Sequence, residues 1–148
     1  MEIQQDFKEL FECFNASRVD YLIVGGHAVA FHGAPRFTGD IDLYVKPDPA
    51  NAQKILKALD TFGFGGLDLT AEDFLEPDKV IQLGVPPVRI DLITSISGVT
   101  WEDAANSAVE GKYGGVPVSY IGRDTLIINK KSTGRKRDAA DLEALEGG

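Results

Sequence analysis

Three aspartates lie inside short apolar runs, where burying a charged side chain is costly unless it has a partner. Asp40 and Asp42 alternate with aliphatic residues in "DIDLYV", and Asp91 lies within "VRIDLI". Because strand side chains alternate between two faces, Asp40 and Asp42 share one face, with alpha carbons about 6.6 Å apart. Carboxylates this close repel each other and raise each other's pKa unless a cation lies between them.

A divalent cation would relieve this repulsion. If the two runs form neighbouring strands, the three carboxylates converge on one patch of the sheet. Mg²⁺ prefers oxygen ligands, keeps several waters and is commonly shared with substrate phosphates. Such a set can also bridge two metals for an in-line displacement. We therefore predict that Asp40, Asp42 and Asp91 are catalytic metal ligands; for Asp-x-Asp alone, a solvated edge strand is the alternative.

Two features before the paired aspartates could bind phosphate. Gly25 and Gly26 end the apolar run "DYLIV", where they would let the backbone approach a phosphate closely. Arg36 lies with Thr38 in the following loop, where a guanidinium could hold a phosphate with two hydrogen bonds. The alternative interpretations are a plain tight turn for the glycines and a loop-stabilising role for Arg36 and Thr38.

A local excess of positive charge lies near the end of the chain. The nine residues 129–137 contain five cations and no acid: Lys130, Lys131, Arg135, Lys136 and Arg137. In a helix, Lys130 would lie on the inward face marked by Leu126 and Ile127, and there it would need an anionic partner. Arg135 could bind phosphate or pair with Asp138. We assign the other three cations to a solvated face.

Composition narrows the class of protein. The 148 residues carry 15 Lys and Arg against 23 Asp and Glu, a net charge of −8, which opposes broad electrostatic binding of nucleic acid. One cysteine and two histidines exclude an intramolecular disulfide and a Cys/His zinc cluster, and we assign His27 and His32 to helix packing or capping. Since no apolar stretch approaches the ~20 residues of a membrane span, we expect a cytoplasmic single domain, 1–148.

The elements that must position these residues follow from periodicity and turn signals. An α/β or α+β domain with a mixed sheet is predicted. Residues 79–85 and 88–96 are expected to be antiparallel neighbours. We expect strands at 20–26, 40–45, 79–85, 88–96 and 116–122, and helices at 3–16, 27–33, 48–63, 100–111, 124–131 and 136–145, with one helical turn, capped by Thr70, in 66–78.

Together these motifs resemble the nucleotidyltransferase superfamily that includes polymerase beta. Its pattern is an apolar strand, a glycine pair, an apolar-flanked Asp-x-Asp and a third aspartate on a later strand. The spacer "HAVAFHGAPRFTG" and the tail "LIINKKSTGRKRDAADLEAL" are similar to a small prokaryotic branch related to abortive-infection toxins of toxin-antitoxin systems. In that branch's closing motif, Lys130, Arg135, Asp138 and Asp141 fill the matching positions.

The resemblance implies a palm-like fold and transfer of NMP from an NTP to a hydroxyl or amine, with release of pyrophosphate. It implies that Asp40 and Asp42 bind the metals, Asp91 binds the metal that activates the nucleophile, and Lys130 contacts phosphates. The acceptor stays open between an RNA end, a protein and a small molecule, and a cognate partner protein is conceivable. A non-catalytic nucleotide-binding or antitoxin-like module, or a phosphohydrolase, are the competing hypotheses.

Overall fold

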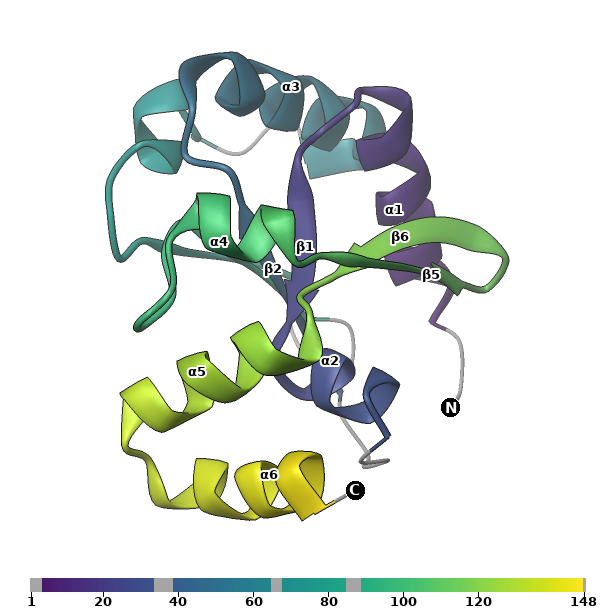
Figure 1. The fold of residues 1–148 in the computed structure, drawn as a ribbon. Coiled ribbons are helices and arrows are strands. Elements are labelled where there is room, and N and C mark those ends of the chain that lie inside the picture. The colour runs from purple at the N-terminus through teal and green to yellow at the C-terminus, as the bar shows by residue number, and fades with distance from the viewer. Residues whose placement is uncertain (1–3, 34–38, 65–67, 85–88, 148) are drawn as a thin grey trace.

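The computed structural model describes residues 4–33, 39–64, 68–84 and 89–147, which build one six-stranded sheet with helices on both sides (Figure 1). The elements, in chain order, are α1 Gln5–Ala16, β1 Tyr21–Val24, α2 Gly25–Phe31, β2 Asp40–Val45, α3 Pro49–Leu59, η1 Asp60–Phe64, η2 Ala71–Phe74, β3 Val80–Leu83, β4 Arg89–Ile93, α4 Trp101–Asn106, β5 Val109–Tyr113, β6 Val116–Tyr120, α5 Arg123–Thr133 and α6 Lys136–Gly147.

The strand order is β3-β4-β2-β1-β6-β5. β2 runs parallel to β4 and β1 parallel to β6, while the other neighbours are antiparallel. The predicted mixed sheet is therefore confirmed, as is the predicted antiparallel pairing of β3 with β4. β2 and β1 occupy the centre, where both faces can be covered.

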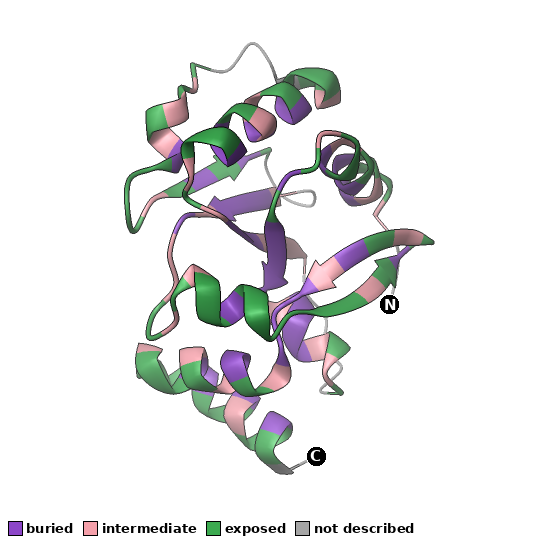
Figure 2. Cartoon of the chain, turned by 45° about the horizontal axis from the view of Figure 1, so that its top comes forward, coloured by how far each residue is buried: buried purple, intermediate pink, exposed green. Residues whose placement is uncertain are grey.

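The core lies where α1 and α3 cover the sheet, and the inward sides of these elements are buried in Figure 2. From α1, Phe7, Phe11 and Phe14 are almost fully buried, at helical spacing. The strands contribute aliphatic residues such as Ile41 and Leu43, each at 0% exposure. Burying one such side chain stabilises the fold by about 1.5–3 kcal/mol. No described helix has the length and apolar character needed to cross a membrane.

Two predicted elements differ from the structure. The predicted helix 100–111 is wrong in its second half, because α4 ends at Asn106 and Val109 begins an edge strand paired with β6. Gly111 on that strand leaves space for two rings, since a Cβ there would lie 2.9 Å from both Phe31 and Tyr120. The glycine pair was expected to end a strand, yet α2 begins at Gly25 itself.

A buried amide fixes the ends of β1 and β2. Asn51, 1% exposed on α3, accepts a hydrogen bond from the Asp20 backbone NH at 2.7 Å. Its amide donates to the backbone carbonyls of Asp20 and Lys46, both at 3.0 Å. Asp48 caps the same helix, as its position before Pro49 predicts, by accepting from the Asn51 NH. One side chain thus ties the helix to both strands that lead into the carboxylate cluster.

We expect Asn51→Ala to lower the free energy of unfolding by about 2–4 kcal/mol, because it leaves buried backbone groups without partners. Urea unfolding followed by circular dichroism measures the change. The control is Gln53→Ala on the exposed side of α3, which should shift stability by less than about 0.5 kcal/mol. Equal stability of the two variants would contradict the structural role of Asn51.

Candidate active site

Parallel pairing of β2 with β4 brings the predicted metal ligands together. In this register Asp42 lies directly opposite Asp91, and Asp40 lies opposite Arg89. Because side chains opposite each other point to the same face, the Asp42 and Asp91 carboxylates are neighbours on one patch of sheet. Asp91 is 7% exposed. The predicted convergence of three carboxylates is thus present in the strand register.

Gly25 allows β1 and α2 to approach this patch. Its φ is +66°, a conformation that side chains disfavour, and a Cβ built there would lie 2.3 Å from Asp42 Oδ2. The residue before it, Val24, pairs with Asp42 across β1 and β2. Glycine is therefore required for two independent reasons, backbone conformation and space. The Asp42 carboxylate rests against bare backbone.

The pKa of Asp42 reflects its burial and the repulsion among the carboxylates of the cluster. Burial raises the pKa of Asp42, and the charges of Asp91 and Asp40 raise it further, to about 6, although Arg89 and Lys130 act in the opposite direction. The mutual repulsion expected from the Asp-x-Asp spacing is therefore present. A bound cation would lower this pKa by stabilising the charged carboxylate.

Arg89 is a cationic neighbour of the cluster that the sequence analysis passed over. Its Nε donates to Asp91 Oδ1 and its Nη2 to Asp91 Oδ2, both at 3.1 Å. The same Nε lies 3.9 Å from Asp40 Oδ2. The available signal was the spacing i, i+2 on one strand, which places Arg89 and Asp91 on the same face. This contact raises the pKa of the Arg89 guanidinium, so Arg89 stays charged.

Lys130 has the anionic partners that its inward position requires. Its Nζ lies 3.0 Å from Asp138 Oδ1 and 3.3 Å from Asp141 Oδ2, and the side chain is only 8% exposed. Arg135 Nε donates to Asp138 Oδ2 at 2.8 Å, the ion-pair alternative of the sequence analysis. Burial alone would raise the pKa of Asp138, but hydrogen bonds from Thr133, Lys130 and Arg135 lower it to about 2. These pairs join α5 to α6.

The carboxylates and the α5 to α6 pairs face one cavity of about 950 Å³, within the size range of small-molecule sites. Both predicted glycines, Gly25 and Gly26, line it. Its described lining has six acids (Asp40, Asp42, Asp78, Asp91, Asp138 and Asp141) and three bases (Arg89, Lys130 and Arg135), which gives a formal charge of 3 − 6 = −3. An anionic substrate entering this cavity needs accompanying positive charge.

The ligand chemistry fits a hard divalent cation such as Mg²⁺. Asp40, Asp42 and Asp91 supply only oxygen, and the repulsion around Asp42 is the kind that a cation removes. As the side chains stand, however, no group of three acids, histidines or cysteines among the described residues is arranged to hold an ion. Both oxygens of Asp91 accept hydrogen bonds from Arg89 instead.

The other predicted residues divide between packing roles and undescribed positions. Arg36 and Thr38 lie outside the described residues. His32 Nε2 donates to the Ile121 carbonyl at 2.7 Å, which fits the predicted packing role. His27 packs against Phe7, and burial lowers the pKa of His27. Its Nε2 is buried without a hydrogen-bond partner among the described residues.

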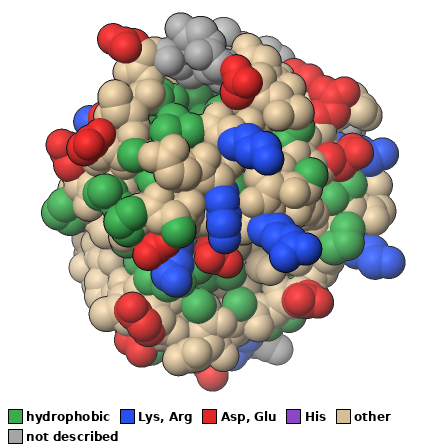
Figure 3. All heavy atoms as spheres, turned by 90° about the horizontal axis from the view of Figure 1, so that it is seen from above, with side chains coloured by type: hydrophobic (Ala, Val, Ile, Leu, Met, Phe, Trp, Pro, Cys, Tyr) green, Lys and Arg blue, Asp and Glu red, His purple; other side chains and the backbone are tan. Residues whose placement is uncertain are grey.

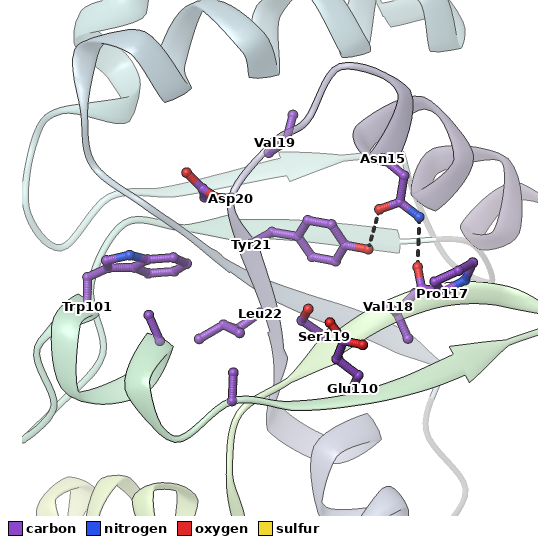
Figure 4. A pocket seen from close by; sticks show the side chains of 12 residues that line it. Asn15, Val19, Asp20, Tyr21, Leu22, Trp101, Glu110, Pro117, Val118 and Ser119 are labelled. Carbon is purple, nitrogen blue, oxygen red and sulfur yellow. Dashed lines mark hydrogen bonds between the residues drawn. The ribbon is translucent and has the colours of Figure 1, made fainter.

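A second cavity, of about 340 Å³, lies between α4 and the β5 and β6 hairpin (Figure 4). Trp101 and Tyr21 contribute aromatic surface to it, and Glu110 contributes a carboxylate. Asn15 accepts from the Tyr21 hydroxyl at 3.1 Å and donates to the Pro117 carbonyl at 2.7 Å. None of the residues predicted to act in chemistry lines this cavity. The chemistry of the described residues is concentrated in the larger one.

The surface above α1 and α3 carries charged side chains of both signs. Seen from that end, Lys and Arg side chains gather near the middle of the view, with acidic side chains between and around them (Figure 3). Charges of both signs are therefore mixed on this face. Broad electrostatic binding of nucleic acid needs a face dominated by positive charge.

Solved structures place this fold among the nucleotidyltransferases. A Thermotoga maritima protein assigned as a nucleotidyltransferase aligns with a TM-score of 0.61 at 13% identity, over 95% of this chain and 90% of that one. The lincosamide antibiotic adenylyltransferase LnuA aligns with a TM-score of 0.56 at 13% identity, over 99% and 98%. ANT(2″)-Ia aligns with a TM-score of 0.51 at 13% identity, over 95% of each chain.

The sequence then gives the family. The chain belongs to the family described as "Nucleotidyl transferase of unknown function (DUF2204)", whose profile matches residues 3–147. No curated protein sequence matches the chain. The predicted nucleotidyltransferase fold is thus confirmed, while the expected toxin-antitoxin branch stays a prediction.

We expect Gly25→Ala to displace the Asp42 carboxylate and destabilise the protein by about 2–4 kcal/mol, since it adds both a clash and a strained φ. Gly33→Ala is the matched control. Gly33 has a φ of +103°, but no atom of the described residues beyond its chain neighbours lies within 4 Å of where its Cβ would be. Thermal unfolding of both variants separates backbone strain from contact with Asp42. A Gly25→Ala protein no less stable than Gly33→Ala would contradict the close approach.

We expect Asp42→Asn to make the metal-free protein more stable at neutral pH. A carboxylate whose pKa rises from 3.8 to about 6 on folding costs nothing below pH 4, increasingly destabilises the fold between pH 4 and 6, and keeps that cost above pH 6. Asparagine removes the cost, so the variant should gain about 1–2 kcal/mol at pH 7.5 and nothing at pH 4.

Urea unfolding in EDTA at the two pH values measures this gain. Asp60→Asn, which removes one exposed negative charge outside the cavity, is the control for net charge. A gain of the same size at pH 4 and pH 7.5 would show that the titration of Asp42 is not its source.

Proposed function

We propose that the protein is a Mg²⁺-dependent nucleotidyltransferase that moves NMP from an NTP to a hydroxyl or amine acceptor. The observation that carries the proposal is the pairing of Asp42 with Asp91, beside Asp40, in a cavity of about 950 Å³. Family membership and fold agree with it. The oxygen ligands and the −3 lining support metal dependence.

In this reaction the acceptor oxygen or nitrogen forms a bond to the α-phosphorus. The bond from that phosphorus to the oxygen bridging it to the β-phosphorus breaks, and pyrophosphate leaves with the bonding electrons. Bound Mg²⁺ would supply charge neutralisation and would favour the deprotonated acceptor. Asp40, Asp42 and Asp91 would hold it, and Asp91 would also help remove the acceptor's proton.

The remaining predicted residues would bind the nucleotide. Gly25 and Gly26 line the cavity beside Asp42, where their backbone would lie close to the phosphates. Lys130 and Arg135 would act on the phosphates from the α5 and α6 side, although both are engaged by Asp138 in this structure. Arg36 and Thr38 remain proposed phosphate contacts from the loop before β2.

The acceptor is the open choice among an RNA end, a protein and a small molecule. LnuA was solved with lincomycin and ANT(2″)-Ia with adenylyl-2″-tobramycin, two different small molecules. The fold by itself therefore does not identify the acceptor. A toxin-like role with a cognate partner protein would correspond to an RNA or protein acceptor.

Transfer of label from α-³²P-NTPs, in the presence of Mg²⁺ and a cell extract, tests the proposal. Label should enter RNA, protein or a small molecule, and pyrophosphate should be released. Asp42→Asn should lower transfer by at least about 100-fold, since even the partners of metal ligands contribute 10–100-fold. Because this variant is expected to be the more stable protein at pH 7.5, unfolding would not explain the loss.

Asp60→Asn, outside the cavity, is the matched control and should transfer label at the wild-type rate. Undiminished transfer by Asp42→Asn would refute the proposal. Nucleotide binding without pyrophosphate release would favour the non-catalytic module, and release of inorganic phosphate would favour a phosphohydrolase.

A further inference from the structure

Arg89 occupies the position where a cation is needed. Its guanidinium donates to both oxygens of Asp91 at 3.1 Å and lies 3.9 Å from Asp40. It also lines the larger cavity. The Asp91 side chain is 10% exposed and that of Arg89 33%, so the pair lies at the cavity wall with its carboxylate on the buried side.

This contact and a metal compete for the same atoms. A guanidinium with two parallel hydrogen bonds covers the carboxylate edge along which a metal ion would approach. The two cations would also repel each other at this distance. Among the described residues, no three potential ligand side chains are arranged to hold an ion while Arg89 is in place.

We propose that Arg89 substitutes for the metal at Asp91, so that a divalent cation binds there only when the guanidinium moves to another anion, the triphosphate of the substrate. The inference rests on the proposed function and adds a positioning residue to it. Arg89 stays charged after leaving Asp91 and already lines the cavity. Its planar fork fits phosphate as well as carboxylate.

The consequence is coupling between metal and nucleotide. Metal alone must break two charge-assisted hydrogen bonds to reach Asp91. Nucleotide provides a new partner for the released guanidinium and so removes part of that cost. Metal and nucleotide should therefore bind together more tightly than the product of their separate affinities, and the excess should depend on Arg89.

Arg89→Met tests this because methionine keeps an unbranched side chain and removes the charge. Mn²⁺, which also prefers oxygen ligands, is the probe, and electron paramagnetic resonance counts the free ion. Without nucleotide, Arg89→Met should bind Mn²⁺ about 10-fold to 100-fold more tightly than wild type, the factor that release of about 1.4–2.8 kcal/mol gives. Arg89→Lys, which keeps the charge and loses the fork, should fall between them.

The matched control is Arg135→Met. It removes the same charge from the same cavity, but Arg135 pairs with Asp138, whereas Asp91 accepts its hydrogen bonds from Arg89. Its Mn²⁺ affinity should rise by less than about threefold, as a long-range charge effect does in water. If Mn²⁺ affinity rose equally in the two methionine variants, the effect would come from the net charge of the cavity, and the proposed role of Arg89 would be overturned.

A second measurement adds a non-hydrolysable NTP analogue. The analogue should tighten Mn²⁺ binding in wild type more than in Arg89→Met. If Arg89→Met bound Mn²⁺ with the same affinity as wild type, this inference would be overturned, but the nucleotidyltransferase proposal would stand. Absence of Mn²⁺ binding in both proteins, with and without analogue, would overturn the proposed function together with this inference.

Discussion

The register between β2 and β4 is the constraint on which the site depends. It pairs Asp42 with Asp91, and a slip of one residue would turn one of the two carboxylates to the opposite face. The opposite face fixes the register, since Ile41 and Leu92 are fully buried there and Ile90 is 2% exposed. Packing of the apolar residues against α1 and α3 therefore sets the separation of the carboxylates on the other side.

The second wall of the cavity depends on buried charge as well as on apolar packing, since Leu126 of α5 and Leu145 of α6 are also buried. Lys130 is held by Asp138 and Asp141, and this contact joins α5 to α6 across the turn at Gly134. Removing one member of such a buried group leaves an uncompensated charge, which costs about 3–5 kcal/mol. The directional contacts around Asp138 also fix how α6 lies on α5, which apolar contact alone would leave less specific.

The two strands that carry the aspartates could be predicted because apolar and charged residues alternate along most of their length. "DIDLYV" and "RIDLI" have aliphatic residues on one face and chemistry on the other, and both are strands as expected. β5 was missed because "VEGKY" is an edge strand with mostly exposed residues and a glycine at its centre, which weakens the alternation that identifies a strand. The contact of Lys130 with Asp138 and Asp141 depends on how two helices pack, which local spacing does not determine. The contact of Arg89 with Asp91 could have been predicted, because residues two apart on a strand lie on the same face and these two carry opposite charges.

The balance of charge in the cavity bears on how a nucleotide would bind under the proposed function. Each of the three bases in the described lining of the cavity already forms an ion pair with an acid. Arg89 pairs with Asp91, and Lys130 and Arg135 pair with Asp138. Among the described lining residues, three positive charges against six negative ones leave none in excess for a triphosphate. A free nucleotide would meet net repulsion, whereas a nucleotide that carries divalent cations presents positive charge to Asp40 and Asp42. Under the proposed function, the cavity would therefore favour the metal complex of the nucleotide over the nucleotide alone.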